Sequence, residues 1–268
     1  MSWAEQMMHD KTLAHDYSGQ QMQLLEELIN SLKRDHLVTA GVVGSHLIAV
    51  ASRRLGLAAH LPKAEGGEPV SSEKAKFDLV GRSARDLAMW LMEDEWLRAG
   101  IGMAALNSLL EIDHDKLHEI NAKHIIADLA AGKNLLVVGN FPFVDVMRPS
   151  LRNLWIMEKK PGAGYISENE GYQLLPEADV VAITGSSLIN HTFELIMANC
   201  RPSSFKIMLG PSTPLSPILF DYGLDAIGGA LVEDESGVLL EIEQGAAFRK
   251  LKGVRTMVMA KDSLREFR

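Results

Sequence analysis

Apolar positions recur at helical spacing near the start of the chain and then change to short runs. Residues 2–33 are expected to form a long amphipathic helix. From residue 36 to residue 61, short runs of valine, isoleucine and alanine are separated by glycines, which predicts two or three strands of an antiparallel meander. The stretch 62–72, rich in proline, glycine and charge, is expected to be an exposed loop.

Three further helices are predicted before the pattern changes again. They should cover about 83–93, 100–110 and 116–131, with Ser83 as the N-cap of the first and Gly132 closing the last. The small residues of the second helix should let it approach a neighbour closely. We place a domain boundary near residue 113, which gives an α+β domain over 1–113 and an α/β domain over 114–268.

Apolar runs then alternate with helical stretches to the end of the sequence. The predicted strands lie at 135–139, 154–158, 179–185, 205–210 and 224–229. Strands that alternate with helices indicate a parallel sheet with right-handed crossovers. The expected fold class is α/β, with a C-terminal parallel sheet preceded by a smaller α+β domain.

Composition and charge narrow the class of protein. The chain has 268 residues, 47% of them hydrophobic, and a net charge of -8, which argues against a general nucleic-acid binder. It has no apolar run of membrane-spanning length, and its first residues carry charges where a signal peptide needs an apolar centre. The single cysteine suits a reducing compartment. We therefore expect a cytoplasmic protein that does not act at a membrane.

Residues suited to ligand contact follow each predicted strand. Because the carboxyl ends of parallel strands meet at one edge of a sheet, these loops should line a common site. Glycine lets a ligand approach the backbone, and serine or threonine offers a hydroxyl and nearby amides. The positions are Gly139-Asn140, Glu158, Thr184-Gly185-Ser186, Gly210-Pro211-Ser212 and Gly228-Gly229.

The first of these loops is not a dinucleotide fingerprint. In GNFPF, Gly139 is followed by Asn140, Phe141 and Pro142, and the later glycines of GxGxxG are missing. An NAD site of the usual form is therefore not expected. Glu158 follows the second strand, where an acidic residue often binds ribose hydroxyls. That keeps an adenosine-type ligand such as S-adenosylmethionine open, with a salt bridge to Lys159, Lys160 or Arg152 as the structural alternative.

Two later loops carry hydroxyl groups. In TGSSLINH, over 184–191, Asn190 or His191 could reach a ligand held over Gly185, although a lone histidine is more often a structural residue. In GPSTPLSP, over 210–217, three prolines stiffen a loop that carries Ser212 and Thr213, which keeps a binding site preorganised.

Metal ligands and nucleophiles give weaker signals. His114 and His118 are four residues apart, but the glutamate of a HEXXH protease is missing, so a solvated helix start is the preferred interpretation. No GxSxG elbow occurs, and Cys200 is expected to be a structural thiol rather than a nucleophile.

Several motifs carry a resemblance to a known family. They are VVGNFPF, WIMEKKPGAG, LLPEADVVAITGSSLINHTFELIM and IMLGPSTPLSPILFDYGLDAIGG, with VTAGVVGSHLIAVASRRLGLAAHLP and GIGMAALNSLLE upstream. Together they resemble a bacterial and archaeal family described as heavy-metal chelation proteins of unknown function. The resemblance implies an enolase-N-terminal-like domain followed by a Rossmann-like domain, with a site between them and a link to anaerobic corrinoid metabolism.

The family motifs fall on residues that the strand ends also suggest. Those expected to bind a ligand are Gly139, Asn140, Phe141, Pro142, Glu158, Thr184, Gly185, Ser186, Asn190, Thr192, Gly210, Pro211, Ser212 and Thr213. None is a thiolate, so the set suits a polar organic ligand or hard cation better than zinc or copper.

Two functions remain from these patterns. One is binding of a heavy metal, or of a metal-bearing small molecule such as a cofactor precursor, in the interdomain cleft. The other is an enzyme acting on a small anionic, nucleotide or S-adenosylmethionine-type ligand in the same cleft. In either case a homo-oligomer is expected.

Overall fold

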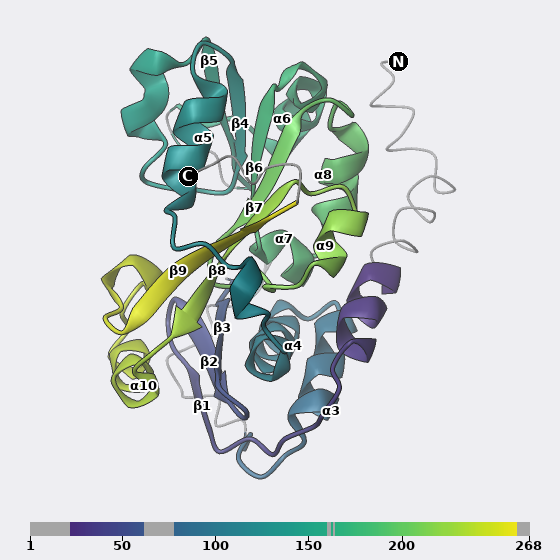
Figure 1. Cartoon of the computed structure of the whole chain (residues 1–268), viewed down its shortest axis with the longest axis vertical. Helices are drawn as coiled ribbons and strands as arrows, with labels where there is room; N and C mark the ends of the chain where they lie inside the picture. The colour runs from purple at the N-terminus through teal and green to yellow at the C-terminus, as the bar shows by residue number, and fades with distance from the viewer. Residues whose placement is uncertain (1–21, 62–77, 160–161, 163, 262–268) are drawn as a thin grey trace.

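The computed structural model describes residues 22–61, 78–159, 162 and 164–261 (Figure 1). Within them the chain forms a three-stranded antiparallel sheet and a six-stranded, mostly parallel sheet. The mixed α/β architecture is therefore confirmed. The loop expected at 62–72 and most of the helix expected at 2–33 lie outside the described residues.

The N-terminal region begins with a helix over 22–30, and its apolar stripe is fully buried, as predicted. The meander follows as β1 (Ala40–Val43), β2 (Leu47–Ala51) and β3 (Leu55–Ala59). Both strand pairs are antiparallel, and β2 is buried along its whole length. The predicted meander is confirmed.

Three helical segments follow this small sheet in the chain; the last of them packs on β2 and β3, and the first two pack on the last. They are α3 (Ala84–Ala88), the 3-10 turn η1 (Met89–Met92) and α4 (Trp96–Leu109). Ser83 caps α3 by accepting a hydrogen bond from the Asp86 N–H at 3.0 Å, as predicted. A Cβ on Gly56 would lie 2.1 Å from the Ala104 carbonyl oxygen, so α4 and β3 pack with their backbones nearly in contact.

The helix predicted over 116–131 is wrong in its first part. The chain forms a 3-10 turn, η2 (His114–Lys116), and only later α5 (Ala122–Ala130). Between them His118 pairs through its backbone with Val258, and Asn121 caps α5 by accepting from the Lys123 N–H at 3.1 Å. A strong N-cap residue at 121 therefore sets the start of the helix.

The large sheet has the strand order β5-β4-β6-β7-β8-β9. The first five of these are parallel to one another and the last is antiparallel. Their bounds are β4 (Asn134–Val138), β5 (Asn153–Met157), β6 (Val180–Thr184), β7 (Phe205–Leu209), β8 (Ala226–Val232) and β9 (Val254–Ala260). The parallel strands are confirmed, whereas β9 was not predicted. Gly228-Gly229 was wrongly expected at a strand end, because β8 continues to Val232.

Short helices and turns connect these strands. They are η3 (Asp145–Ser150), α6 (Glu168–Leu174), η4 (Leu175–Glu177), α7 (Ser186–Ile189), α8 (Phe193–Asn199), α9 (Ile218–Asp221), α10 (Glu235–Glu243) and η5 (Phe248–Lys250). Among the described residues, no helix has the length and apolarity needed to cross a membrane.

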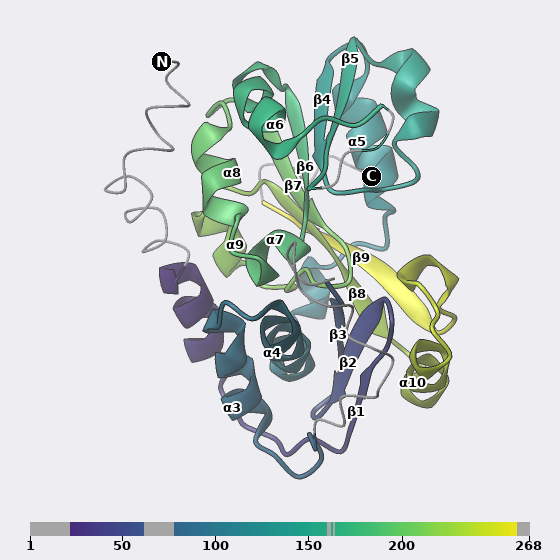
Figure 2. The ribbon, with the colours of Figure 1, turned by 180° about the vertical axis from the view of Figure 1, so that it is seen from behind.

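The two sheets meet where the parallel strands end. In Figures 1 and 2, β8 runs toward the small sheet, so the carboxyl edge of the large sheet faces the N-terminal region. The helix α10 lies against β1 and β2, and Val238 and Ile242 share one apolar cluster with Leu47 and Leu57. The N-terminal sheet is thus covered by its own helices on one face and by α10 on the other.

Candidate functional site

The strand order of the large sheet reverses between β4 and β6, which makes their carboxyl ends the expected place for a ligand. Gly139, directly after β4, has φ +98°, and a Cβ there would lie 3.1 Å from the side chain of Thr184 at the end of β6. The left-handed backbone and the close contact both require glycine. The structure therefore brings Gly139 and Thr184 together.

The residues after Gly139 in the loop that follows β4 are exposed or pack on the core instead of contacting Thr184. Asn140 and Pro142 are exposed, and Phe141 is half-buried. The rings of Phe141 and Phe143 lie 5.7 Å apart and pack against the apolar cluster that includes α5 residues Ile125 and Ile126. Phe141 thus supports the core on that face of the sheet.

Glu158 follows β5 and is half-buried. Burial raises the pKa of its carboxyl group. A hydrogen bond that the carboxylate accepts from the Lys159 backbone N–H lowers the pKa in part. The Lys159 ammonium instead lies 3.4 Å from Glu168 and 5.1 Å from the centre of the Trp96 ring. Among the described residues Glu158 forms no ion pair, so the predicted structural alternative of a salt bridge to Lys159 or Arg152 is not what the structure has.

The turn after β6 uses most of its polar groups internally. Thr184 Oγ1 accepts from the Ser186 N–H at 3.3 Å, and Thr192 Oγ1 donates to Asn190 Oδ1 at 2.7 Å. His191 has φ +55°, and its Nε2 lies 3.0 Å from the Leu91 carbonyl oxygen of the N-terminal region. His191 therefore joins the two regions rather than turning toward Gly185.

The loop after β7 makes the closest contacts with the rest of the predicted site. Gly210 has φ +111°, and a Cβ on Gly185 would lie 2.6 Å from the Thr213 backbone nitrogen. Ser212 Oγ accepts a hydrogen bond from the Ala59 N–H at 2.8 Å. The loop thus touches both the β6 turn and the edge of β3.

Three side chains satisfy the free edge of β3. Glu235 accepts from the Leu55 N–H at 2.8 Å, and Asn107 donates to the Leu57 carbonyl oxygen at 2.9 Å. Ser212 accepts a hydrogen bond from the Ala59 N–H. Alternate residues along the edge are therefore hydrogen-bonded to α10, α4 and the β7 loop in turn. An unpaired strand edge is normally a liability, and here it is closed by side chains.

A pocket of about 290 Å³ lies along this closed edge, between β3 and α4 on one side and β8, β9 and the β7 loop on the other. Of the predicted site residues, only Pro211 and Thr213 line it. The sequence patterns do not single out four other lining residues, Arg54, Asn107, Glu233 and Arg255. Asn107 could have been noticed as a polar residue in a mostly apolar helix, whereas no sequence signal singles out Arg54.

The pocket wall holds both paired and unpaired polar groups. Arg255 contacts Glu233 at 3.0 Å and Glu119 at 3.4 Å. Arg54 is half-buried, and burial lowers the pKa of its guanidinium. Thr213 Oγ1 and Asn107 Oδ1 are buried and have no hydrogen-bond partner. Such groups are costly to leave unsatisfied, so each calls for a partner such as an ordered water or a bound molecule.

The described residues do not offer a protein-held metal site. No group of three or more His, Cys, Asp or Glu side chains among them is placed to hold an ion. Burial raises the pKa of the Cys200 thiol to about 12, which keeps it protonated at neutral pH and agrees with a structural role. The donor set in the described part of the chain therefore does not fit a metal bound by protein ligands alone.

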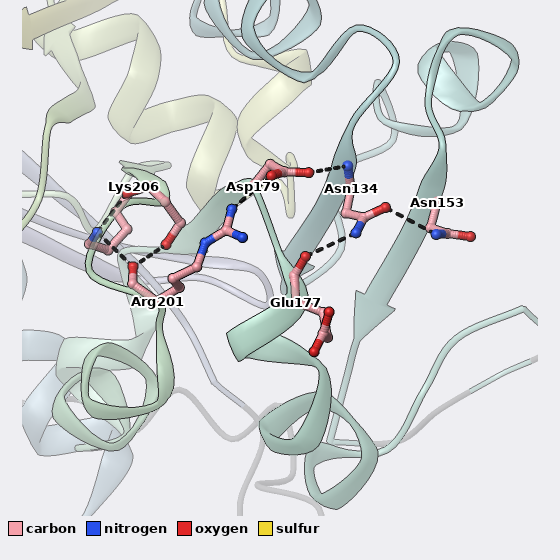
Figure 3. Close-up of polar contacts among 7 residues, drawn as sticks. Asn134, Asn153, Glu177, Asp179, Arg201 and Lys206 are labelled. Carbon is pink, nitrogen blue, oxygen red and sulfur yellow. Dashed lines mark hydrogen bonds and ion pairs between the residues drawn. The ribbon is translucent and has the colours of Figure 1, made fainter.

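The opposite edge of the large sheet carries a separate polar network (Figure 3). Asp179 accepts from the Asn134 N–H at 2.9 Å and from Arg201 at 2.7 Å. Lys206 is 7% exposed, and its Nζ donates to the Ser204 carbonyl oxygen at 2.6 Å. These contacts join the amino ends of the strands, at the edge of the sheet opposite the pocket. We assign them a role in stabilising the fold.

Comparison with known proteins gives consistent matches at low identity. The chain is 24% identical to a protein of unknown function from Desulfitobacterium hafniense, whose crystal structure superposes with a TM-score of 0.75 over 90% of this chain and 98% of that one. A structure from Pyrococcus horikoshii, also of unknown function, gives 17% identity and a TM-score of 0.75 over 90% and 99%. Both structures are described as DUF364 family members, and at these identities they show the fold alone.

Sequence comparison agrees with the structural matches. An uncharacterized protein of Methanocaldococcus jannaschii is 26% identical over 160 residues, which span 57% of this chain and 62% of that protein. Two family models match, DUF4213 over residues 25–110 and DUF364 over residues 121–261, and both carry the description "Putative heavy-metal chelation". Because the second match covers more than half of the sequence, the chain belongs to the DUF364 family.

Proposed function

We propose that the chain binds a metal-bearing small molecule in the pocket between its two sheets and grips the organic part of that molecule. The pocket carries the proposal: about 290 Å³ at the carboxyl edge of the large sheet, with the half-buried Arg54 in its wall. Open α/β sheets bind their ligands beyond the carboxyl ends of their strands, and this pocket lies there along β8, beside rather than at the switch point between β4 and β6. An anionic chelate would be attracted by the guanidinium, which forms bidentate contacts with carboxylates.

Binding of a metal that already carries an organic ligand would reconcile the description "Putative heavy-metal chelation" with the side chains present. Chelation by the described side chains would need a cluster of donors that they do not form. A metal that arrives with its own organic ligands needs no such cluster. The pocket is at the small end of ligand sites, so it favours a compact chelate, or one anionic arm of a corrinoid, over a complete corrinoid ring.

Equilibrium dialysis tests the proposal. Protein purified anaerobically is first analysed for metal, and metal-free protein is then dialysed against Ni²⁺ alone, nickel(II) citrate and hydroxocobalamin. We expect retention of a complex and weak retention of Ni²⁺ alone, with Arg54→Gln reducing retention of the complex about tenfold or more. Arg53→Gln is the matched control, because Arg53 lies in the same turn, pairs with Glu111 at 3.6 Å and does not line the pocket. Stoichiometric binding of bare Ni²⁺ that Arg54→Gln leaves unchanged would contradict it.

A second candidate is an enzyme acting on a nucleotide or S-adenosylmethionine-type ligand. It is favoured by Glu158, which lies at the end of β5 with a raised pKa and no ion pair among the described residues. Thermal-shift screening with nucleotides and S-adenosylmethionine decides it, because a ligand at a hundred times its Kd should add about 2.7 kcal/mol of stability. Stabilisation that Glu158→Gln abolishes would support this candidate, and no response at high concentration would remove it.

We also infer the wider setting of the molecule. The boundary near residue 113 would separate an enolase-N-terminal-like domain from a Rossmann-like domain, in a cytoplasmic homo-oligomer that binds no nucleic acid. The matches of DUF4213 and DUF364 on either side of that position support the boundary. Light scattering on the purified protein measures its oligomeric state, and a monomer at micromolar concentration would exclude the oligomer.

A further inference from the structure

Two residues that line the pocket each carry a polar atom that is shielded from solvent and has no hydrogen-bond partner. Among the described residues, four have a buried side-chain nitrogen or oxygen without a hydrogen-bond partner, and two of the four, Asn107 and Thr213, line this one pocket. Native proteins leave few such atoms, and each calls for a reason such as a missing bound molecule. Two such residues in one wall point to a bound molecule, which would contact the two shielded oxygens once the side chains adjust toward the pocket.

The chemistry required of the ligand can be read from Asn107. Its Nδ2 donates to the Leu57 carbonyl oxygen at 2.9 Å, and a carbonyl oxygen can only accept. That contact fixes the orientation of the amide and leaves Oδ1 as the unpartnered atom. Since Oδ1 is an acceptor, the group that completes it must be a donor, such as a hydroxyl or an amine.

Thr213 supplies a second incomplete group. The residue is 3% exposed, and its backbone N–H already donates to the Gly210 carbonyl oxygen at 3.1 Å. Its hydroxyl has no partner although it can both donate and accept. The oxygen is shielded from solvent, and rotation about the Cα–Cβ bond between staggered positions is the adjustment that would present it to a ligand.

Arg54 adds the charge preference. The carboxylates that raise its pKa are Glu111 and Glu235, and both are engaged elsewhere. Glu111 pairs with Lys33 at 2.7 Å, and Glu235 accepts from the Leu55 N–H at 2.8 Å. A half-buried guanidinium in this position favours an anionic partner, most of all a carboxylate.

We infer that the pocket recognises a small hydroxycarboxylate or aminocarboxylate, with the carboxylate on Arg54 and the hydroxyl or amine on Asn107 and Thr213. This inference rests on the proposed function and names the organic part of the chelate. Compounds of this class bind metals through the same two kinds of group, so they suit a protein that takes up a metal already complexed.

Titration calorimetry with citrate and tricarballylate tests the inference, because the two anions share three carboxylates and differ in one hydroxyl. The full-length chain should bind citrate at least about tenfold more tightly. Thr213→Val and Asn107→Leu should each weaken citrate binding and shrink that preference. Thr213→Val removes an unpartnered hydroxyl at constant shape, so its melting temperature should stay the same or rise. Thr39→Val, away from the pocket, is the matched control and should bind like the unmodified chain.

The outcomes separate this inference from the proposed function. Equal affinity for the two anions, no binding of either, or a preference that survives Thr213→Val would overturn the hydroxycarboxylate assignment. If one of these results is found but nickel(II) citrate or hydroxocobalamin binds in a way that depends on Arg54, the proposed function is supported and only the assigned ligand class is wrong. If the unmodified chain prefers citrate and both variants lose that preference, the result supports the hydroxycarboxylate assignment and the proposed function.

Discussion

The Ser212 hydroxyl accepts a hydrogen bond from the Ala59 N–H at 2.8 Å, and this contact ties the carboxyl edge of the large sheet to the free edge of the small one. Ser212 is 1% exposed, so water does not readily replace it. The same loop carries Thr213, and the same strand edge is bonded to Asn107. The pocket is therefore held in shape by contacts that also join the two regions.

Removing this contact should weaken the fold. Ser212→Ala leaves the Ala59 N–H without its partner, and we expect a loss of about 1–3 kcal/mol in the free energy of unfolding. Urea denaturation followed by circular dichroism measures it. Ser203→Ala, at an exposed position three residues after α8's C-cap Cys200, should change stability little. Equal stability of the two variants would show that the contact is not needed.

The close approach of two strand-end loops makes a second prediction. A Cβ at residue 185 would lie 2.6 Å from the Thr213 nitrogen and 2.7 Å from its hydroxyl, so Gly185→Ala should displace the β7 loop. We expect a cost of about 1–3 kcal/mol, as for overpacked sites. Gly162→Ala, where a Cβ would meet nothing within 4 Å, is the control. Thermal unfolding that fails to separate the two variants would contradict this packing.

The amino-edge network should affect stability without affecting the pocket. The Asn134 N–H and Arg201 lower the pKa of Asp179, so its ionised form is favoured in the fold. That contribution is present above the carboxyl's ordinary pKa and is lost as the pH falls through the lowered value. Asp179→Ala should cost about 1–2 kcal/mol at pH 7 and less in acid.

Two measurements check the Asp179 prediction. Chemical denaturation at pH 7 and at pH 3 should show a smaller difference between Asp179→Ala and the unmodified chain in acid. Nickel(II) citrate binding should be unchanged, because the network lies at the other edge of the sheet. Asp128→Ala, at an exposed position on α5, is the control. Loss of ligand binding in Asp179→Ala alone would argue against the separation of stability and binding.

Glu194 should make the protein less stable in alkaline solution. The residue is 6% exposed, both its carboxylate oxygens lack partners, and burial raises its pKa to about 8. The folded chain therefore holds a proton that the unfolded chain releases at lower pH, so stability falls as the pH rises between the two pKa values, by up to roughly 1.4 kcal/mol per pH unit. Tyr222, whose hydroxyl bonds to Glu27, is the other titrating group nearby.

A neutral substitute isolates this effect. Glu194→Gln should raise the melting temperature near pH 9 and change it little near pH 5, where the glutamate is already protonated in the fold. Glu177→Gln, at an exposed position, should leave the pH dependence as it is. A fall in stability with pH that survives Glu194→Gln would assign it to another group.

Much of the fold follows from local pattern, and the pocket does not. Alternating runs and glycines predict the meander, the parallel strands and the placement of Gly139, Thr184 and Gly210 at one edge. Strand β9 was missed because it carries Arg255 and Thr256 in its exposed part and pairs as an antiparallel edge. Arg54 lies more than 150 residues before Thr213, and no periodicity shows that the two share a wall. Long-range packing decides that part of the site.

Anomalous diffraction from crystals soaked with nickel(II) citrate tests the central claim most directly, because it locates the metal and shows what holds it. We expect a nickel peak inside the pocket between β3 and β8, with citrate against Arg54, Asn107 and Thr213 and no protein side chain bonded to the metal. A nickel ion bound directly by protein side chains, or a complex at Gly139 and Glu158 with the pocket unchanged, would contradict it.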